Sequence, residues 1–345
     1  MKDPFIDYRF AREDRKVAHP KTPAGWADAY IFFRRSLGFK TVELEKVLRQ
    51  LLVFMQKRGL ASFDRIDRKL ASEWLYQGSP QELTILVRLA TIRGFFRYLV
   101  SLGALDASPW DAFNYPKPKR FMPFVFPVDE IKRLFGYLRG RAGRAGPKSD
   151  LYFAYYALFH TIYACGLRAQ EGCKLNIGDT DFGSSIFTVR ETKFGKSRLV
   201  PFNARTGQIV REYLECYRPS EDGMPQDAPL FLNLIRKRFR PKLISGHFSK
   251  VCSELGIGQG KQVRGSMVYG GATLHSLRHS FAVHRLLKWY EEGADVNAKL
   301  PLLSTYMGHV HYKHTQRYLT VLPVFIDMAG KMLAGEFETT LKDIE

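Results

Sequence analysis

Six side chains in the second half of the chain are suited to chemistry on a phosphodiester. They are Arg168, Lys193, His275, Arg278, His309 and Tyr318. A guanidinium offers a planar fork of N–H donors that matches two phosphate oxygens, and lysine cannot reproduce that geometry. Two such forks from distant segments could hold one phosphate while negative charge builds on it. A tyrosine hydroxyl could then attack the phosphorus without help from a metal ion.

The spacing within residues 274–281 favours one face of a helix. His275 and Arg278 are three residues apart, which places their Cβ atoms about 5–6 Å from each other if the segment begins a helix. An isolated pair of this kind is often a surface pair. Arg168 is equally open to a surface salt bridge with Glu171, so neither motif decides the chemistry alone.

Tyr318 is the candidate nucleophile, and its distance from His309 predicts a turn. Nine residues of continuous helix would put the two side chains on opposite faces. We therefore expect a turn over Val310–Lys313, followed by a new helix that begins near Thr315. Tyr306 and Tyr312 are the alternative nucleophiles because they lie close by in the sequence.

The histidines do not form a recognisable metal-binding motif. No H-E-x-x-H pattern and no nearby set of carboxylates accompanies either group, and no G-x-S-x-G segment indicates a serine hydrolase. The two groups are His275, His279 and His284, and His309, His311 and His314. The sequence thus predicts neither a metal nor another cofactor.

Charge favours a nucleic-acid partner. The chain of 345 residues has a formal net charge of +19, and the excess of Lys and Arg is shared by residues 1–120 and the remainder. Solubility or an acidic protein partner are the alternatives, but a protein that binds a polyanion from two sides has this composition. The four cysteines lack C-x-x-C spacing, which predicts reduced, buried thiols in a reducing compartment.

No membrane association is expected. The N-terminus lacks the apolar core of a signal peptide. The most apolar stretch, residues 151–166, contains four tyrosines and is too short and too polar to cross a bilayer. It is better interpreted as a buried helix, and we expect a cytoplasmic protein.

A proline-rich and basic segment, residues 114–123, predicts an extended linker between two domains. Before it, apolar residues between Leu44 and Met55 recur at helical spacing and Gly59 provides a stop. A second helix is predicted from about Leu83 to Leu102. Arg93 and Arg97 lie off its apolar stripe, which indicates either a solvated face or contact with phosphate.

The part after the linker is expected to be mainly helical. A helix should run from Asp129 to about Leu138, followed by a basic, glycine-rich loop over residues 139–148 and the apolar helix. Residues 185–190 and 197–202 read as two strands of a hairpin joined by 191–196. Residues 256–271 form a glycine-rich, basic insertion to which the sequence assigns no role. The predicted fold is therefore mainly α with one small antiparallel β-sheet (α+β).

Taken in order, these segments resemble the tyrosine recombinase/integrase family. The matching pieces are Gly-Leu-Arg168-x-x-Glu171, Thr-Lys193 followed by Ser-Arg-Leu-Val-Pro, His275-x-Leu-Arg278-His-Ser-Phe-Ala, and Met-Gly-His309 nine residues before Tyr318. The resemblance extends from about Val128 to Leu319 and is more diffuse over residues 30–115. It implies an N-terminal arm and helical core-binding domain (1–115), a linker (116–124) and a catalytic domain with a C-terminal helix (125–345).

The resemblance also implies a role for each residue. Arg168 and Arg278 would bind the non-bridging oxygens of the scissile phosphate. Tyr318 would attack phosphorus to give a 3′-phosphotyrosyl link, and Lys193, with Lys196 as its rival, would protonate the leaving 5′-oxygen. Further roles would be management of the tyrosine proton by His275, a hydrogen bond to the phosphate from His309, and support of Arg168 by Glu171.

The implied activity is site-specific DNA recombination in integration, excision or transposition. The implied partners are double-stranded DNA, further protomers in a dimer or tetramer on that DNA, and other recombinases. Additional DNA contacts are expected from Arg93, Arg97, Lys117, Lys119, Arg120 and Lys196, and the protein would associate with the nucleoid. A type IB topoisomerase and a catalytically silent DNA-binding protein remain the alternatives. The apolar segment Val321–Leu333 would dock either on a neighbouring protomer or on its own domain.

Overall fold

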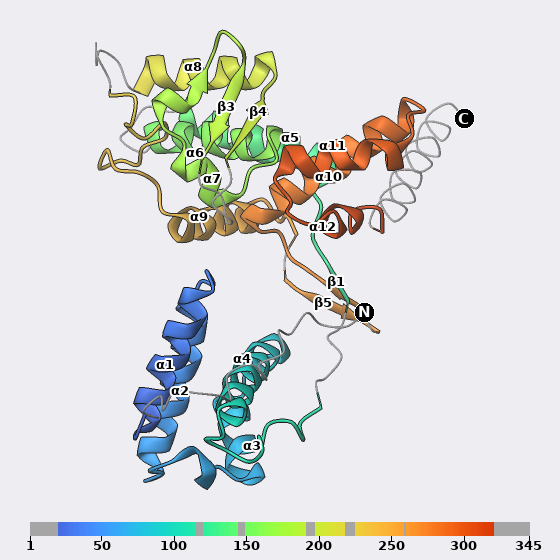
Figure 1. Cartoon of the computed structure of the whole chain (residues 1–345). Coiled ribbons are helices and arrows are strands. Elements are labelled where there is room, and N and C mark those ends of the chain that lie inside the picture. The colour runs from blue at the N-terminus through green and yellow to red at the C-terminus, as the bar shows by residue number, and fades with distance from the viewer. Residues whose placement is uncertain are drawn as a thin grey trace. The chain divides into compact units, whose positions relative to one another are not determined.

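The computed structural model describes residues 20–114, 120–143, 149–190, 197–217, 225–258, 260–265 and 267–320. These residues form two compact units, one in the chain up to residue 118 and one from residue 119 onward (Figure 1). Each unit has a hydrophobic core of its own. None of the described helices combines the length and the apolar character needed to cross a membrane.

Over its described residues, 20–114, the first unit is built from four α-helices around an aromatic core. The helices are α1 (Pro23–Ser36), α2 (Val42–Lys57), α3 (Arg68–Tyr76) and α4 (Glu82–Ser101), with one 3-10 turn at Phe63–Arg65. The apolar stripe of α2 is buried as predicted, and Gly59 follows that helix with φ of 67°. Helix α4 lies within one residue of its predicted bounds. Phe95, Phe96 and Trp110 are completely buried in this core.

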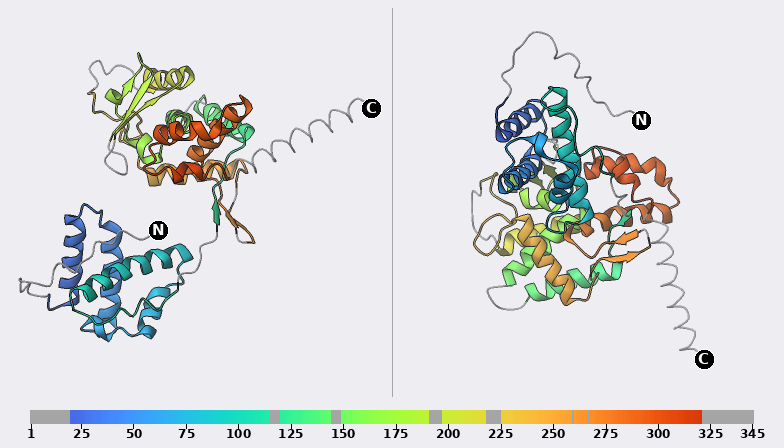
Figure 2. Two further views of the ribbon diagram at one scale, coloured as in Figure 1. Left: turned by 45° about the vertical axis from the view of Figure 1, so that its right-hand side comes forward. Right: turned by 90° about the horizontal axis from the view of Figure 1, so that it is seen from below.

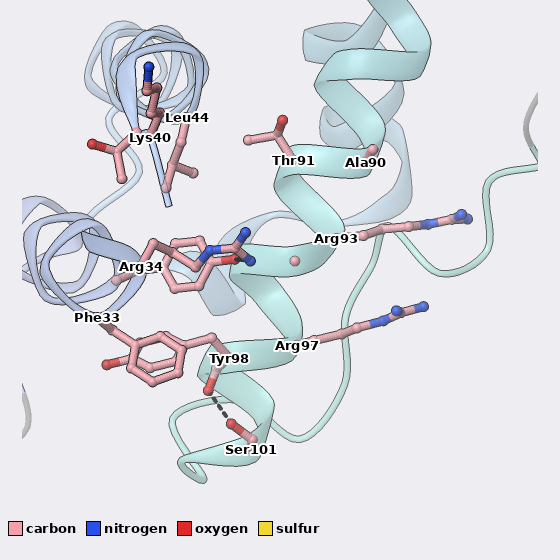
Figure 3. Close-up of a pocket in the computed structure, with 13 residues that line it drawn as sticks. Phe33, Arg34, Lys40, Leu44, Ala90, Thr91, Arg93, Arg97, Tyr98 and Ser101 are labelled. Atoms are coloured by element: carbon pink, nitrogen blue, oxygen red, sulfur yellow. Dashed lines mark hydrogen bonds between the residues drawn. The ribbon is translucent and has the colours of Figure 1, made fainter. Parts of the chain in front are cut away.

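Arg93 connects α4 to the end of the first unit. Its guanidinium donates hydrogen bonds to the carbonyl oxygens of Trp110 (3.1 Å), Asp111 (3.3 Å) and Phe113. Only 14% of the side chain is exposed. Arg93 and Arg97 extend from α4 away from Arg34 (Figure 3). The guanidinium of Arg93 thus holds residues 110–113, the segment that carries the buried Trp110. The expected contact of Arg93 with DNA stays a prediction.

Eight α-helices form most of the second unit in the residues that the structure describes. They are α5 (Val128–Ala142), α6 (Ser149–Ala164), α7 (Ala169–Lys174), α8 (Ala204–Tyr217), α9 (Pro241–Glu254), α10 (Leu274–Glu291), α11 (Val296–Met307) and α12 (Lys313–Gln316). Helix α6 is the apolar segment identified in the sequence, and it packs against α5, α8 and α10. Because its side chains are apolar around most of the helix, burial on several sides is the stable arrangement. The predicted buried helix is therefore confirmed.

Two small three-stranded sheets complete this unit and lie apart from each other (Figure 2). The first is antiparallel, with β2 (Thr180–Asp181), β3 (Ile186–Val189) and β4 (Arg198–Pro201) in that order. The second has the order β1-β6-β5, where β1 (Arg120–Met122) runs parallel to β6 (Met267–Tyr269) and β5 (Gln262–Arg264) runs antiparallel to it.

The mainly helical α+β fold class is confirmed, but two details of the prediction are wrong. The sequence predicted one sheet, whereas the glycine-rich insertion forms a hairpin that pairs with β1, a strand inside the predicted linker. Helix α5 also continues four residues into the predicted 139–148 loop. Arg139 explains that extension because it donates to both carboxylate oxygens of Glu212 and lies over the Phe153 and Tyr156 rings.

Several predicted features lie outside the described residues. These are the 191–196 loop with Lys193 and Lys196, the linker residues Lys117 and Lys119, and the Val321–Leu333 segment. Arg120 is placed in β1 by its backbone alone.

Replacing Arg93 tests its structural role. Arg93→Lys removes the fork that reaches three carbonyl groups, so we expect the free energy of unfolding to fall by about 1–3 kcal/mol. Arg97→Lys, on the exposed side of the same helix one turn later, is the control and should change it little. The measurement is urea unfolding of the full chain followed by tryptophan fluorescence. Equal stability of both variants would contradict the role assigned to Arg93.

Candidate active site

The candidate site is organised around one buried carboxylate, that of Glu171. Chain reversal at Gly166 ends α6 and makes Arg168 the N-cap of α7, so that Glu171 occupies the third position of the new helix. One carboxylate oxygen accepts the Arg168 backbone N–H at 2.9 Å, and the other accepts Nη1 of the same arginine at 2.6 Å. Arg198 of β4 donates through both Nη atoms, at 3.2 and 2.9 Å. Nη1 of Arg278 lies 3.8 Å away.

The charges in this cluster do not balance. Burial alone would raise the pKa of Glu171, but the hydrogen bonds and charge of Arg198, with Arg168 and Arg278, outweigh burial and lower that pKa to about 2. Burial, reinforced by Arg168, lowers the pKa of Arg278 to about 10, so this guanidinium remains charged at neutral pH. Three cations therefore share one carboxylate, and the excess positive charge favours an anion beside them.

Main-chain carbonyl groups fix the direction of the two arginines predicted to bind phosphate. Arg278, only 1% exposed, donates from Nη1 to the Gly166 carbonyl at 2.6 Å and from Nη2 to the Met307 carbonyl at 2.7 Å. Arg168 donates from Nη2 to the Gly308 carbonyl at 3.2 Å. A guanidinium has five N–H donors in a rigid plane, so these contacts orient the remaining donors.

Two of these three carbonyl groups belong to glycines with a left-handed backbone. Gly166 has φ of 57°, and a Cβ atom there would lie 2.4 Å from Cδ1 of Phe281. Gly308 ends α11 with φ of 66°, and a Cβ atom there would lie 2.8 Å from Nη1 of Arg198. Both positions thus require glycine for conformation and for space.

Tyr318 enters the site after the predicted turn. Helix α11 ends at Met307 and α12 begins at Lys313, so the expected break between His309 and Tyr318 is confirmed. Tyr318 is 5% exposed. Its hydroxyl lies 2.9 Å from Nδ1 of His279, and its ring is nearly parallel to that of His309, with centroids 6.4 Å apart. Burial raises the pKa of Tyr318, an effect that the nearby Arg278 and Arg317 oppose.

The site histidines are neutral at physiological pH. Burial, with nearby cationic or imidazole groups, lowers the pKa of His275 to about 4 and those of His279 and His309 to about 3. The His275 and His279 rings meet edge to face, with centroids 4.5 Å apart. His309 shares a hydrogen bond of 2.8 Å between its Nδ1 and Oγ1 of Thr315.

The two alternative tyrosines occupy different surroundings. The Tyr306 hydroxyl donates to the Pro201 carbonyl at 2.7 Å, and its ring stacks on Phe281. Tyr312 is 39% exposed at the start of α12. Tyr318 thus has the more suitable position beside the arginines and histidines.

The structure brings most of the predicted residues together. Arg168, Glu171, His275, Arg278, His309 and Tyr318 lie in one site, whereas Lys193 lies outside the described residues. Sequence reasoning assigned no role to Arg198 or His279. The signals were present: Arg198 belongs to the Ser-Arg-Leu-Val-Pro segment, and His279 follows Arg278 one helical turn after His275.

Comparison with known proteins decides the family. Residues 125–323, more than half of the chain, match the model described as the phage integrase family. The chain belongs to this family. It is accordingly a tyrosine-type DNA recombinase, an enzyme of the class that cleaves and rejoins DNA strands.

Relatives and solved structures agree with this membership. An integrase/recombinase of Sinorhizobium fredii, y4rB, is 33% identical over 310 residues, which cover 90% of this chain and 96% of the relative. The tyrosine recombinase XerC of Pelobacter propionicus is 28% identical and covers 80% and 83% of the two chains. Two solved structures share the fold: the Tn1549 transposon integrase with right-end DNA (17% identity, TM-score 0.61, 86% and 94% covered) and a lambda integrase dimer on a COC′ core site (16%, 0.60, 86% and 77%).

Gly166→Ala tests the close approach behind the arginines. The left-handed backbone and the clash with Phe281 should together lower the free energy of unfolding by about 2–5 kcal/mol. Gly136→Ala is the control, because that residue lies in α5 where a Cβ atom meets nothing within 4 Å. It should raise stability by about 0.5–1 kcal/mol. Urea unfolding measures both, and a harmless Gly166→Ala would contradict the described packing.

The lowered histidine pKa values predict how stability depends on pH. Protonating these buried rings costs the folded state more than the unfolded state, so their contribution is complete above about pH 6.5 and declines as the pH falls toward 4. Wild type should therefore lose stability to urea between about pH 7 and pH 5. His309→Asn should lose less, whereas His311→Asn, at an exposed position away from His309, should behave like wild type. Parallel pH curves for wild type and His309→Asn would contradict the shielding of His309.

Proposed function

We propose that this protein is a site-specific DNA recombinase that works through a 3′-phosphotyrosyl intermediate. The observation that carries the proposal is the buried Tyr318 hydroxyl beside an arginine cluster with excess positive charge. Such a cluster suits a phosphodiester, whose charge grows in the transition state. The nucleophile and the phosphate-binding groups are thus provided by one unit of the chain.

Each of the predicted residues has a place in this reaction. Arg168 and Arg278 bind the non-bridging oxygens while Tyr318 attacks phosphorus and the 5′-oxygen leaves. Lys193 protonates that oxygen, with Lys196 as the alternative acid. His309 hydrogen-bonds the phosphate. His275, whose pKa is lowered by burial and by the nearby Arg278 and Arg168, is assigned to the proton of Tyr318.

Covalent catalysis explains how the broken strand is rejoined. The phosphotyrosyl bond retains the energy of the broken phosphodiester, so a 5′-hydroxyl from a partner strand can reverse the step without ATP or a metal ion. Glu171 supports the reaction by holding Arg168 and Arg198 in place. We assign the activity to integration, excision or transposition of DNA.

The remainder of the chain is proposed to bind and arrange the DNA. Its net charge of +19 suits a polyanion, and the helical first unit would serve as the core-binding domain. Arg97, Arg120 and the linker lysines are the proposed phosphate contacts. One solved neighbour is a lambda integrase tetramer on a Holliday junction, which supports assembly of this chain as a dimer or tetramer on DNA in the nucleoid.

Covalent trapping on a nicked duplex tests the proposed function. The probe is a double-stranded DNA with the sequence that flanks the gene, nicked so that the cleaved end diffuses away. We expect wild type and Tyr312→Phe to form a protein–DNA adduct on a denaturing gel, and Tyr318→Phe to form none, because it lacks the attacking oxygen.

The other outcomes are equally informative. Adduct lost only in Tyr312→Phe would assign the nucleophile to Tyr312. DNA binding without adduct from wild type would favour a catalytically silent binding protein. A wild-type protein that forms the adduct and relaxes supercoiled DNA, but never joins two duplexes, would favour the topoisomerase alternative.

A further inference from the structure

His279 occupies a position that none of the proposed catalytic roles accounts for. It follows Arg278 on α10, and its Nδ1 lies 2.9 Å from the Tyr318 hydroxyl oxygen. We propose that His279 orients the Tyr318 hydroxyl and receives its proton when the tyrosine attacks. This inference rests on the proposed function and reassigns the tyrosine proton from His275 to its neighbour one helical turn later.

Geometry separates the tasks of the two histidines on α10. Burial and the charges of Arg278 and Arg168 lower the pKa of His275, and no hydrogen bond joins it to Tyr318 among the contacts of the described residues. His279 touches Tyr318 directly, and their ring centroids are 5.6 Å apart at 58°. The edge-to-face contact with His275 fixes the orientation of the His279 ring.

The third histidine contacts the tyrosine in another way. The His309 ring lies nearly parallel to that of Tyr318, and Nδ1 of His309 is already engaged by Thr315. A group that takes a proton must lie within hydrogen-bonding distance of the oxygen that gives it up. Nδ1 of His279 meets that requirement.

The proton transfer balances within one turnover. As the bond from the Tyr318 oxygen to phosphorus forms and the bond from phosphorus to the 5′-oxygen breaks, the phenolic proton moves to Nδ1 of His279. The leaving 5′-oxygen takes a different proton from the acid, proposed to be Lys193. During rejoining, the incoming 5′-hydroxyl gives its proton back to the acid, now neutral, as its oxygen attacks phosphorus. The bond from phosphorus to the Tyr318 oxygen breaks, and His279 returns its proton to that oxygen.

The charges around His279 tie this transfer to the presence of DNA. Burial, His275 and Arg278 on the same helix, Arg317 beside the tyrosine and His309 together lower its pKa to about 3 in the chain without DNA. The ring is therefore neutral and able to accept a proton. A bound phosphodiester offsets the charge of Arg278 and Arg317, and it gains further negative charge during attack. The imidazolium thus becomes favourable as the reaction proceeds.

Substitution by asparagine separates orientation from proton transfer. In His279→Asn the side-chain amide lies near the place of Nδ1 and can hold the tyrosine hydroxyl, but it cannot be protonated at neutral pH. The measurements are binding to the nicked duplex and the single-turnover rate of adduct formation from about pH 6 to pH 9. His311→Asn, on the exposed turn before α12, is the matched control, and His275→Asn is measured in parallel.

We expect His279→Asn to bind the duplex like wild type and to cleave it about 10²-fold more slowly or worse. Its rate should rise steadily with pH, because solvent hydroxide must replace the missing base. A more acidic phenol, introduced as 3-fluorotyrosine at position 318, should partly restore cleavage in His279→Asn and change wild type much less. A role for His279 in packing alone would give neither the pH dependence nor the rescue.

The outcomes distinguish this inference from the proposed function. Absence of adduct from wild type would overturn both. Wild-type cleavage rates and pH dependence in His279→Asn would overturn the inference and leave the recombinase activity intact. The pH dependence and rescue found in His275→Asn instead would return the tyrosine proton to His275.

Discussion

Glu171 is a single ionised carboxylate beneath three guanidinium groups that come from separate segments of the second unit. A buried carboxylate is costly unless it is paired and fully hydrogen-bonded, and here the start of α7, strand β4 and helix α10 supply the partners. The carboxylate of Glu171 needs hydrogen-bonding partners, and this requirement determines where α7, β4 and α10 meet. The arginines repel one another, and in the proposed reaction the anion that relieves this repulsion is the scissile phosphate.

Helix α10 connects the arginines proposed to bind phosphate to the proposed nucleophile, Tyr318. Its first two turns carry His275, Arg278 and His279 at spacings of three and four residues, so they share one face. Arg278 contacts the carboxylate cluster and the end of α11, while His279 contacts Tyr318. A displacement of this helix would move the anion-binding groups and the partner of the attacking oxygen together.

The features that the sequence predicted well were those with a local physical signal. Helix α4 follows from its apolar stripe, residues 274–281 follow from the spacing of His275 and Arg278, and the break before α12 follows from the need to place His309 and Tyr318 in one site. The residue types alone were sufficient to group the arginines with the tyrosine. That the arginines and Tyr318 lie close together in space was only expected from the sequence, and the positions of α7, α10 and α12 show it.

The features that it missed depend on contacts between distant segments. Strand β1 has three residues and acquires its partner from the far insertion, so no local pattern marks the second sheet. Arg139 extends α5 because Glu212 and two aromatic rings lie beside it. Arg93 resembled a candidate phosphate contact because the sequence does not show which carbonyl groups lie within its reach. His279 gained significance only when α12 brought the tyrosine hydroxyl to its ring.

The carbonyl groups that hold Arg168 and Arg278 belong to the main chain, and this has a consequence for how such enzymes diverge. Met307 supplies an acceptor whatever its side chain, so exchange for another apolar residue that fills the same space leaves the anchor of Arg278 in place. Gly166 and Gly308, whose carbonyl groups hold Arg278 and Arg168, have a left-handed backbone conformation that only glycine adopts freely. Lineages of this enzyme can therefore drift at the apolar positions around the arginines while the two glycines stay fixed.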